Sequence, residues 1–198
     1  MDSTLTLVNP IPATQYYFSA NSMKNTTVFV HQSRPLYNVS TELKSDKQTR
    51  VSDAHTGRLI ALVERREIFS DTVTFPNQNG GQALSIHKWL QKSKLADGYT
   101  VHLMQTSHRQ YIWKSDSRHR LGLYKESDQT QPIAYLQPVS ATQNFALVLE
   151  SSAEAFRDDV LVAFLILEQR LRISERNVNV GGGKFEANKT VLGHYAQT

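Results

Sequence analysis

The sequence predicts a mostly β domain: an antiparallel β-barrel of short strands that encloses one hydrophobic α-helix near the C-terminus. Three observations predict this fold. Short β-type segments recur about every ten residues, separated by turn residues. A continuous apolar run occupies residues 160–167. The 198-residue chain is 39% hydrophobic and 20% charged, which is typical of a folded domain with a sizeable core.

The strands are predicted from alternating or continuous apolar residues bounded by turn signals. Residues 59–63 are apolar on both faces, so this strand is expected to be central in the sheet. A helical turn is expected around residues 89–94, and residues 5–8 are a candidate edge strand. The predicted strands are residues 27–31, 36–43, 59–63, 71–75, 99–104, 109–114, 121–125, 133–136 and 144–149.

The run at residues 160–167 lacks the polar stripe of a surface helix, so it is expected to be surrounded by protein. Its β-branched residues would also suit a buried strand. Good helix formers on both sides, residues 153–157 and 168–172, favour a helix of about twenty residues. The expected caps and charges agree with the helix dipole: Ser151, Ser152, Glu154, Asp158 and Asp159 at the start, and Arg170, Arg172 and Arg176 at the end.

The expected organisation is one domain at residues 9–176, an N-terminal extension at 1–8 and a flexible tail at 177–198. The chain has no cysteine, so disulfides and thiolate metal sites are excluded. It has neither a secretory signal pattern nor an apolar run long enough to span a membrane. We therefore expect a cytoplasmic protein that can lie at the membrane periphery.

Basic residues are concentrated in one region of the sequence. Residues 86–125 carry a net charge of +6, whereas the whole chain carries +4. Such an excess can attract anionic headgroups, phosphates or acidic proteins, although it is also compatible with a solvated strand face. The candidate ligand-binding residues in this region are Lys88, Lys92, Arg109, Lys114, Arg118 and Arg120.

The order of elements resembles the tubby C-terminal-like superfamily, which includes phospholipid-scramblase-like and LURP-one-related proteins. The residues that carry the resemblance are 109–114, 121–124, 132–135 and the helix from Asp158 to Arg172, and it covers about residues 9–175. Within the superfamily, the sequence is most similar to a group of uncharacterised fungal, chiefly mushroom, domains. The resemblance implies a β-barrel of about twelve strands threaded by the hydrophobic helix. Tubby proteins bind phosphoinositides, but their binding positions do not map onto this sequence one by one.

Acid–base residues are present without a recognisable catalytic motif. None of the seven histidines has a metal-ligand spacing, so no metal or other cofactor is expected. The weak catalytic candidates are three histidines and one tyrosine that could converge in space: His102, His108, His119 and Tyr111. Isolated surface histidines and a core aromatic are the simpler interpretation of the same residues.

Two hypotheses about function follow. The first is a noncatalytic binding or scaffold protein that recognises an anionic lipid headgroup or an acidic partner through its basic strand surface. The alternative is a small fungal biosynthetic enzyme, an isomerase or cyclase, that binds an apolar metabolite in a barrel pocket beside a His or Tyr acid–base group. A purely structural or oligomerising role is a third interpretation. Nucleic acid is not an expected partner, and the sequence leaves the ligand and the oligomeric state open.

Overall fold

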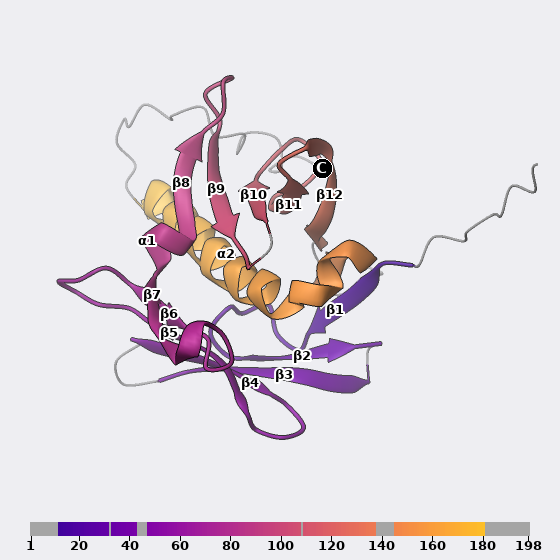
Figure 1. Ribbon diagram of the computed structural model, residues 1–198, viewed down its shortest axis with the longest axis vertical. Helices are drawn as coiled ribbons and strands as arrows, with labels where there is room; N and C mark the ends of the chain where they lie inside the picture. Colours follow the sequence, from indigo (N-terminus) through magenta and orange to yellow (C-terminus); the bar gives the residue numbers. More distant parts are fainter. Residues whose placement is uncertain (1–11, 32, 43–46, 108, 138–144, 181–198) are drawn as a thin grey trace, which may run out of the picture.

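A computed structural model of the chain describes residues 12–31, 33–42, 47–107, 109–137 and 145–180. These residues form one antiparallel sheet of thirteen strands that wraps around a long C-terminal helix, α2 (Figure 1). The predicted fold class, a mostly β protein with one C-terminal hydrophobic helix, is confirmed.

The N-terminal half of the sheet is a meander in which each strand pairs with the next along the chain. Tight turns between short strands make this order the simplest way to build an antiparallel sheet. A 3-10 turn, η1 (Asn79–Gly81), joins the last two strands. The strands are β1 (Thr14–Phe18), β2 (Thr26–Val30), β3 (Arg34–Thr41), β4 (Gln48–Asp53), β5 (Leu59–Glu64), β6 (Thr72–Thr74) and β7 (Ala83–Ser85).

The second half is another meander, and it joins the first through the pairing of β1 with β13. Figure 1 shows β8–β12 on one side of α2 and β2–β4 on the other, so that the helix lies inside the curved sheet. The strands are β8 (Leu90–Lys94), β9 (Thr100–Gln105), β10 (Gln110–Lys114), β11 (Gly122–Lys125), β12 (Asp128–Gln137) and β13 (Ala146–Leu149).

The predicted barrel is not fully closed, because β7 and β8 are the two edges of the sheet. A four-residue helix, α1 (Ile86–Trp89), links them, and Ile86 and Trp89 bury their side chains in the core. Trp89 meets Phe75 edge-to-face with ring centroids 5.2 Å apart. Side-chain packing at α1 therefore takes the place of hydrogen bonds at the seam. The helical turn expected at 89–94 was misplaced: it lies at Ile86–Trp89, and the residues after it form β8.

The helix α2 (Arg157–Val180) confirms the main prediction from the apolar run. All eight side chains of residues 160–167 are buried, with exposed fractions between 0 and 6%. Phe164 lies at the centre of this contact, with its ring 5.7 Å from that of Phe18 and 6.2 Å from that of Phe145. A helix that is apolar on every side is stable here because the sheet removes water from its whole circumference.

The start and end of α2 differ from the sequence prediction. A 3-10 helix, η2 (Ser151–Phe156), precedes it, and Glu150 rather than Ser151 or Ser152 occupies the N-cap, with no side-chain capping bond. The helix continues to Val180, four residues into the segment expected to be a tail, so the predicted basic residues lie before its last turn. The remainder of that tail, the extension at 1–8 and the candidate strand at 5–8 lie outside the described residues.

Candidate functional site

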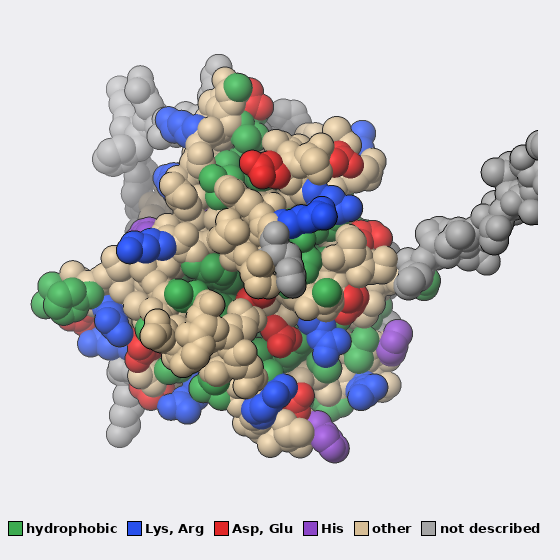
Figure 2. All heavy atoms as spheres, in the orientation of Figure 1, with side chains coloured by type: hydrophobic (Ala, Val, Ile, Leu, Met, Phe, Trp, Pro, Cys, Tyr) green, Lys and Arg blue, Asp and Glu red, His purple; other side chains and the backbone are tan. Residues whose placement is uncertain are grey.

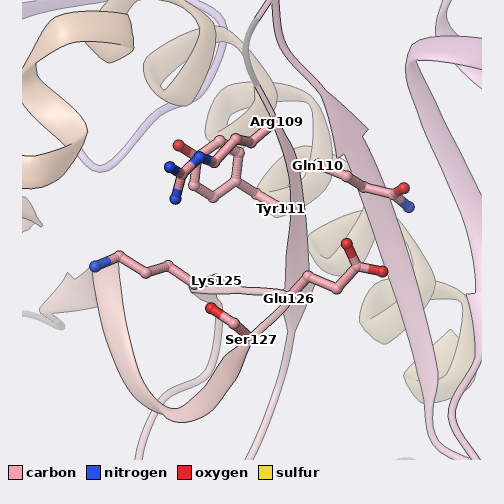
Figure 3. A pocket seen from close by; sticks show the side chains of 6 residues that line it. All are labelled: Arg109, Gln110, Tyr111, Lys125, Glu126 and Ser127. Atoms are coloured by element: carbon pink, nitrogen blue, oxygen red, sulfur yellow. The ribbon is translucent and has the colours of Figure 1, made fainter.

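An open depression of about 440 Å³ lies at the mouth of the barrel, where β10 begins and β11 ends. Strand residues and the β11–β12 turn line it: Arg109, Gln110, Tyr111, Lys125, Glu126 and Ser127. In Figure 3, Arg109, Tyr111 and Lys125 extend to one side of the two strands, whereas Gln110 and Glu126 point to the other. The first three residues, which we call the cationic mouth, form the candidate site.

Strand pairing explains why these three side chains meet. Tyr111 on β10 lies directly opposite Lys125 on β11, so the two side chains share one face of the sheet. Arg109 precedes Tyr111 by two residues and therefore extends to the same face, because side chains alternate along a strand. Two cations consequently flank one aromatic ring.

The turns on both sides of the cationic mouth are held by local hydrogen bonds. The Arg109 backbone N–H donates to Thr106 Oγ1 at 3.1 Å, and the Thr106 hydroxyl donates to the Arg109 carbonyl at 2.9 Å. On the other turn, Asp128 Oδ1 accepts from the hydroxyl and the backbone N–H of Thr130, at 2.7 and 3.0 Å. These bonds fix the positions from which Arg109 and Lys125 extend.

Tyr111 connects the site to the start of the helical segment. Its ring stacks on that of Phe156 in η2, with centroids 4.6 Å apart and an interplanar angle of 27°. The tyrosine is 8% exposed, so most of its ring packs against the protein. It therefore forms a rigid apolar wall beside two exposed cationic groups.

The cationic mouth has a carboxylate in its surroundings, Asp128, which lies opposite Lys125 and whose pKa the lysine charge helps to lower, after the hydrogen bonds from Thr130. Both Arg109 and Lys125 are exposed, and neither forms an ion pair within the described part of the chain. Glu126, the acidic residue of the lining, faces away from both in Figure 3. An anion entering from solvent would therefore meet two positive groups without displacing a carboxylate.

The other predicted ligand-binding residues have different surroundings. Lys88 on α1, Lys92 on β8 and Arg118 in the β10–β11 turn are exposed and lie apart from the cationic mouth. Lys114 Nζ donates to the Gln129 carbonyl at 2.9 Å and lies 4.5 Å from the centre of the Tyr124 ring. These four residues do not form one site with Arg109.

Arg120, the sixth predicted residue, is part of the structure that holds α2. Its guanidinium binds Glu168 at 3.1 Å and also pairs with Glu175. Glu168 is 1% exposed and binds Arg172 as well, at 2.7 Å. The hydrogen bond to Glu175 is the largest cause that raises the pKa of Arg120 above its usual value. These carboxylates already occupy the guanidinium, so Arg120 is poorly placed to receive a ligand.

Of the predicted acid–base residues that the structure describes, His102 and His119 lie on opposite faces of the sheet. His102 on β9 pairs with Trp113 and shares its face, which is the core side of the sheet. Burial, with Arg170 and Lys92 nearby, lowers the pKa of His102 to about 4, so it is neutral at physiological pH. His119 lies against Tyr135 and Tyr124 on the opposite face. His108 lies outside the described residues.

His119 belongs to a small polar cluster that stabilises the β10–β11 turn. Asp116 accepts hydrogen bonds from the Tyr124 hydroxyl and from the backbone N–H groups of Arg118 and His119, the latter two at 2.8 and 2.7 Å. Burial alone would raise the pKa of Asp116, but these bonds outweigh it and lower the pKa. Burial, followed by the bond to Asp116, raises the pKa of Tyr124. The tyrosine therefore keeps its proton and serves the fold.

A crevice between the helix and the sheet is very small. It is lined by Met23, Val51, Val162 and neighbouring residues and holds about 10 Å³, roughly the volume of one water-sized probe. This crevice is too small for a metabolite. Among the described residues, no group of three metal-ligating side chains is close enough to hold an ion, and no helix is long and apolar enough to cross a bilayer.

A family model described as "Family of unknown function (DUF6593)" matches residues 21–173. The chain belongs to this family. No curated protein matches the sequence. An X-ray structure of a protein from Arabidopsis thaliana is similar to the DUF6593 chain, with a TM-score of 0.51 and 12% identity. The match covers 79% of this chain and 90% of the plant protein. At this identity, the similarity concerns the fold alone.

Two features of the DUF6593 site were not predicted. Lys125 was recognised as part of the basic segment but was not selected as a ligand-binding residue, and Phe156 was assigned to the start of the helix. The alternation of Arg109 and Tyr111 along one strand was visible in the sequence. The missing information was the strand register, which pairs Tyr111 with Lys125 across the turn.

Proposed function

We propose that this DUF6593 domain is a noncatalytic binding module. Its cationic mouth binds the phosphate group of an anionic ligand. The observation that carries the proposal is a pair of cations, Arg109 and Lys125, that flank an aromatic wall without an ion pair in the described chain. Arginine can bind two phosphate oxygens at once, and lysine adds a point charge. The ring of Tyr111 offers an apolar surface to the carbon skeleton of the ligand.

The small volume of the crevice beside α2 supports a ligand at the mouth rather than at that crevice. The crevice beside α2 has about 10 Å³, compared with about 440 Å³ for the depression at the mouth. The latter volume lies in the range of small-ligand sites, which is about 300–1,000 Å³. The resemblance of the sequence to phosphoinositide-binding and lipid-associated barrels is in agreement with a phosphorylated ligand.

Calorimetric titration of the full chain with inositol 1,4,5-trisphosphate, a soluble phosphorylated headgroup, tests the proposal. Binding should weaken between 0.1 and 1 M salt, over which the screening length falls from about 10 Å to about 3 Å. Arg109→Gln and Lys125→Gln should each weaken binding by about tenfold, the contribution of one charge-assisted hydrogen bond.

Arg118→Gln is the matched control, since it removes an exposed arginine of the same basic segment outside the cationic mouth. It should leave the affinity unchanged. An equal loss of affinity in Arg118→Gln would show that the net charge of the segment, and not this site, attracts the anion. Titration with a triglutamate peptide separates the two sources of negative charge, because carboxylates alone should bind more weakly than phosphates if the arginine fork selects the ligand.

A further inference from the structure

The β5–β6 hairpin carries two large apolar side chains at its tip. Ile68 is 88% exposed and Phe69 is 72% exposed, which makes them the most exposed large hydrophobic residues among those described between β1 and β7. The hairpin projects from the side of the molecule below α1 in Figure 1. Figure 2 shows hydrophobic side chains at the end of the same projection, with charged side chains behind them.

The base of the hairpin is fixed, so the tip extends away from the protein. The strand ladder runs up to the pair Glu64–Thr72. The Arg65 N–H then donates to the Lys47 carbonyl at 2.7 Å, and the Arg66 N–H donates to Asp71 Oδ1 at 3.1 Å. With these bonds in place, Ile68 and Phe69 cannot fold back onto the core without opening the turn.

Single exposed apolar residues are common and need no explanation, but two adjacent bulky ones at a projecting tip form a small apolar patch. A turn between two strands can be built from polar residues, which would keep the hairpin without this exposure. The fold therefore does not require Ile68 and Phe69, and a partner that removes them from water would stabilise the bound state.

The charges behind the tip suit a lipid surface. Lys47 Nζ pairs with Glu67 at 3.0 Å, and the Arg66 guanidinium pairs with Glu64 at 3.3 Å. Each carboxylate next to the tip is therefore matched by a cation, which removes the repulsion that a free carboxylate would experience at an anionic bilayer. Long lysine and arginine side chains can also follow a lipid phosphate while the residues beyond them enter the apolar region.

The size of the patch distinguishes a bilayer from a second protein. Two such side chains offer at most a few hundred Å², whereas a stable protein interface buries about 1,200–2,000 Å². A narrow tip is suited to shallow insertion into a bilayer instead, because lipids can rearrange around two inserted side chains. Phenylalanine and isoleucine at the end of a loop are well matched to the boundary between headgroups and acyl chains.

We propose that Ile68 and Phe69 insert into the interfacial region of a lipid bilayer, with Lys47 and Arg66 at the level of the headgroups. This inference is independent of the proposed ligand of the cationic mouth. The projection arises between β5 and β6, whereas the cationic mouth lies on β10 and β11, and Figure 1 places these pairs of strands in different parts of the molecule. Two side chains alone give weak, reversible attachment, comparable to a single acyl anchor at best.

Vesicle sedimentation with phosphatidylcholine vesicles, and with vesicles that also contain phosphatidylserine, tests the proposal. The wild-type chain should bind both, and the double variant Ile68→Ser/Phe69→Ser should lose binding by at least about tenfold, since each buried side chain of this size contributes about that factor. Val178→Ser is the matched control, because Val178 is also 72% exposed but lies on α2, and its variant should bind as the wild type does.

A Phe69→Trp variant reports insertion directly. The two native tryptophans, Trp89 and Trp113, are buried, so the new indole supplies the lipid-sensitive part of the emission. Its emission should shift to the blue on adding vesicles, and brominated lipids should quench it. An unshifted, unquenched emission, equal sedimentation of the wild type and the double serine variant, or a tip-dependent dimer in ultracentrifugation would each overturn the proposal. Arg109→Gln should still bind phosphatidylcholine vesicles, and the double serine variant should still bind the soluble headgroup, so each proposal can fail separately.

Discussion

Asp159, at the start of α2, provides a pH-dependent contribution to stability that can be worked out from its surroundings. The carboxylate is 7% exposed, and its hydrogen-bond partner is Gln78 Nε2 at 3.2 Å. Burial, reinforced by the charge of Asp158, raises the pKa of Asp159 to about 6, although the bond from Gln78 opposes the shift. The folded protein therefore holds this proton more tightly than the unfolded chain, in which the pKa is near 3.8.

The sign of the effect follows from this difference. The stabilising contribution is complete below about pH 4 and disappears as the pH rises through about 6, because the unfolded chain releases the proton first. The pKa difference corresponds to about 3 kcal/mol as an upper limit. Asp159→Asn removes the titration and keeps a partner for Gln78. The variant should therefore gain up to this amount relative to the wild type between pH 4 and 7.5.

Urea unfolding followed by tryptophan fluorescence gives the free energy of unfolding of the wild type and of Asp159→Asn across this pH range. Asp128→Asn is a control with the opposite expected sign, because hydrogen bonds from Thr130 lower the pKa of Asp128, which is exposed at the start of β12. Its variant should lose stability relative to the wild type as the pH rises above the carboxyl range. If the free energy difference between Asp159→Asn and the wild type is the same at every pH, Asp159 does not titrate in this interval and the reasoning is refuted.

Three further substitutions test how the helix and the sheet are held together. Phe164→Ala should lower the free energy of unfolding by about 3–5 kcal/mol, because it empties a fully buried aromatic site; Val178→Ala, on the exposed side of α2, should change it by less than about 0.5 kcal/mol in the same urea titration. Glu168→Gln should lower the free energy of unfolding by about 2–3 kcal/mol, since Arg120 and Arg172 both lose a buried carboxylate partner. This loss of stability should persist in high salt, and a loss below about 0.5 kcal/mol would contradict the prediction. Gly122→Ala places a Cβ 2.8 Å from the Tyr124 ring and should lower the free energy of unfolding by about 1–3 kcal/mol, with a change in near-ultraviolet circular dichroism. Gly57→Ala strains a backbone with φ of 72° but places no atom within 4 Å of its Cβ, so it should lower stability without changing that signal.

The helix and the apolar strands were predictable because their signal is local. Residues 160–167 and 59–63 are apolar without interruption, and burial is the outcome that such a pattern favours. The strands β1, β4, β7 and β8 were not predicted. Their sequences alternate polar and apolar residues unevenly, as in Gln48–Asp53, and their strand conformation depends on pairing with neighbours.

The candidate site required information that is distant in the sequence. Arg120 was predicted as a ligand-binding residue because it lies in the basic segment, but its partners Glu168 and Glu175 follow 48 and 55 residues later. Lys125 became part of the site only through its register with Tyr111. Net charge along a segment therefore pointed to the region that contains the candidate site. The pairing of individual charges, which the fold determines, decided which of its cations form no ion pair among the described residues.

The carboxylates at the two ends of α2 have different partners, and none of these partners belongs to the cationic mouth. At the C-terminal end, arginines from the sheet pair with helix carboxylates, as Arg120 does with Glu168. Near the start of the helix, Tyr16 donates to Glu154 at 2.8 Å and Tyr37 donates to Asp158. Arg157 of the helix itself lies 3.9 Å from Glu154 and 4.0 Å from Asp158. The carboxylates at this end consequently do not compete for Arg109 and Lys125.

We expect the charge of Glu154 to act on the cationic mouth, because Glu154 lies two residues before Phe156, on which Tyr111 stacks. Glu154→Gln keeps a hydrogen-bond acceptor for Tyr16 and removes one negative charge from this end of the barrel. We expect it to tighten binding of inositol 1,4,5-trisphosphate severalfold at low salt, and the gain should shrink at 1 M salt as screening increases. Glu42→Gln is the control, because Glu42 lies beyond the end of β3, away from the lining of the mouth. Unchanged affinity in Glu154→Gln would mean that the site selects its ligand by shape and hydrogen bonding, and not by the electrostatic field that Arg109 and Lys125 dominate.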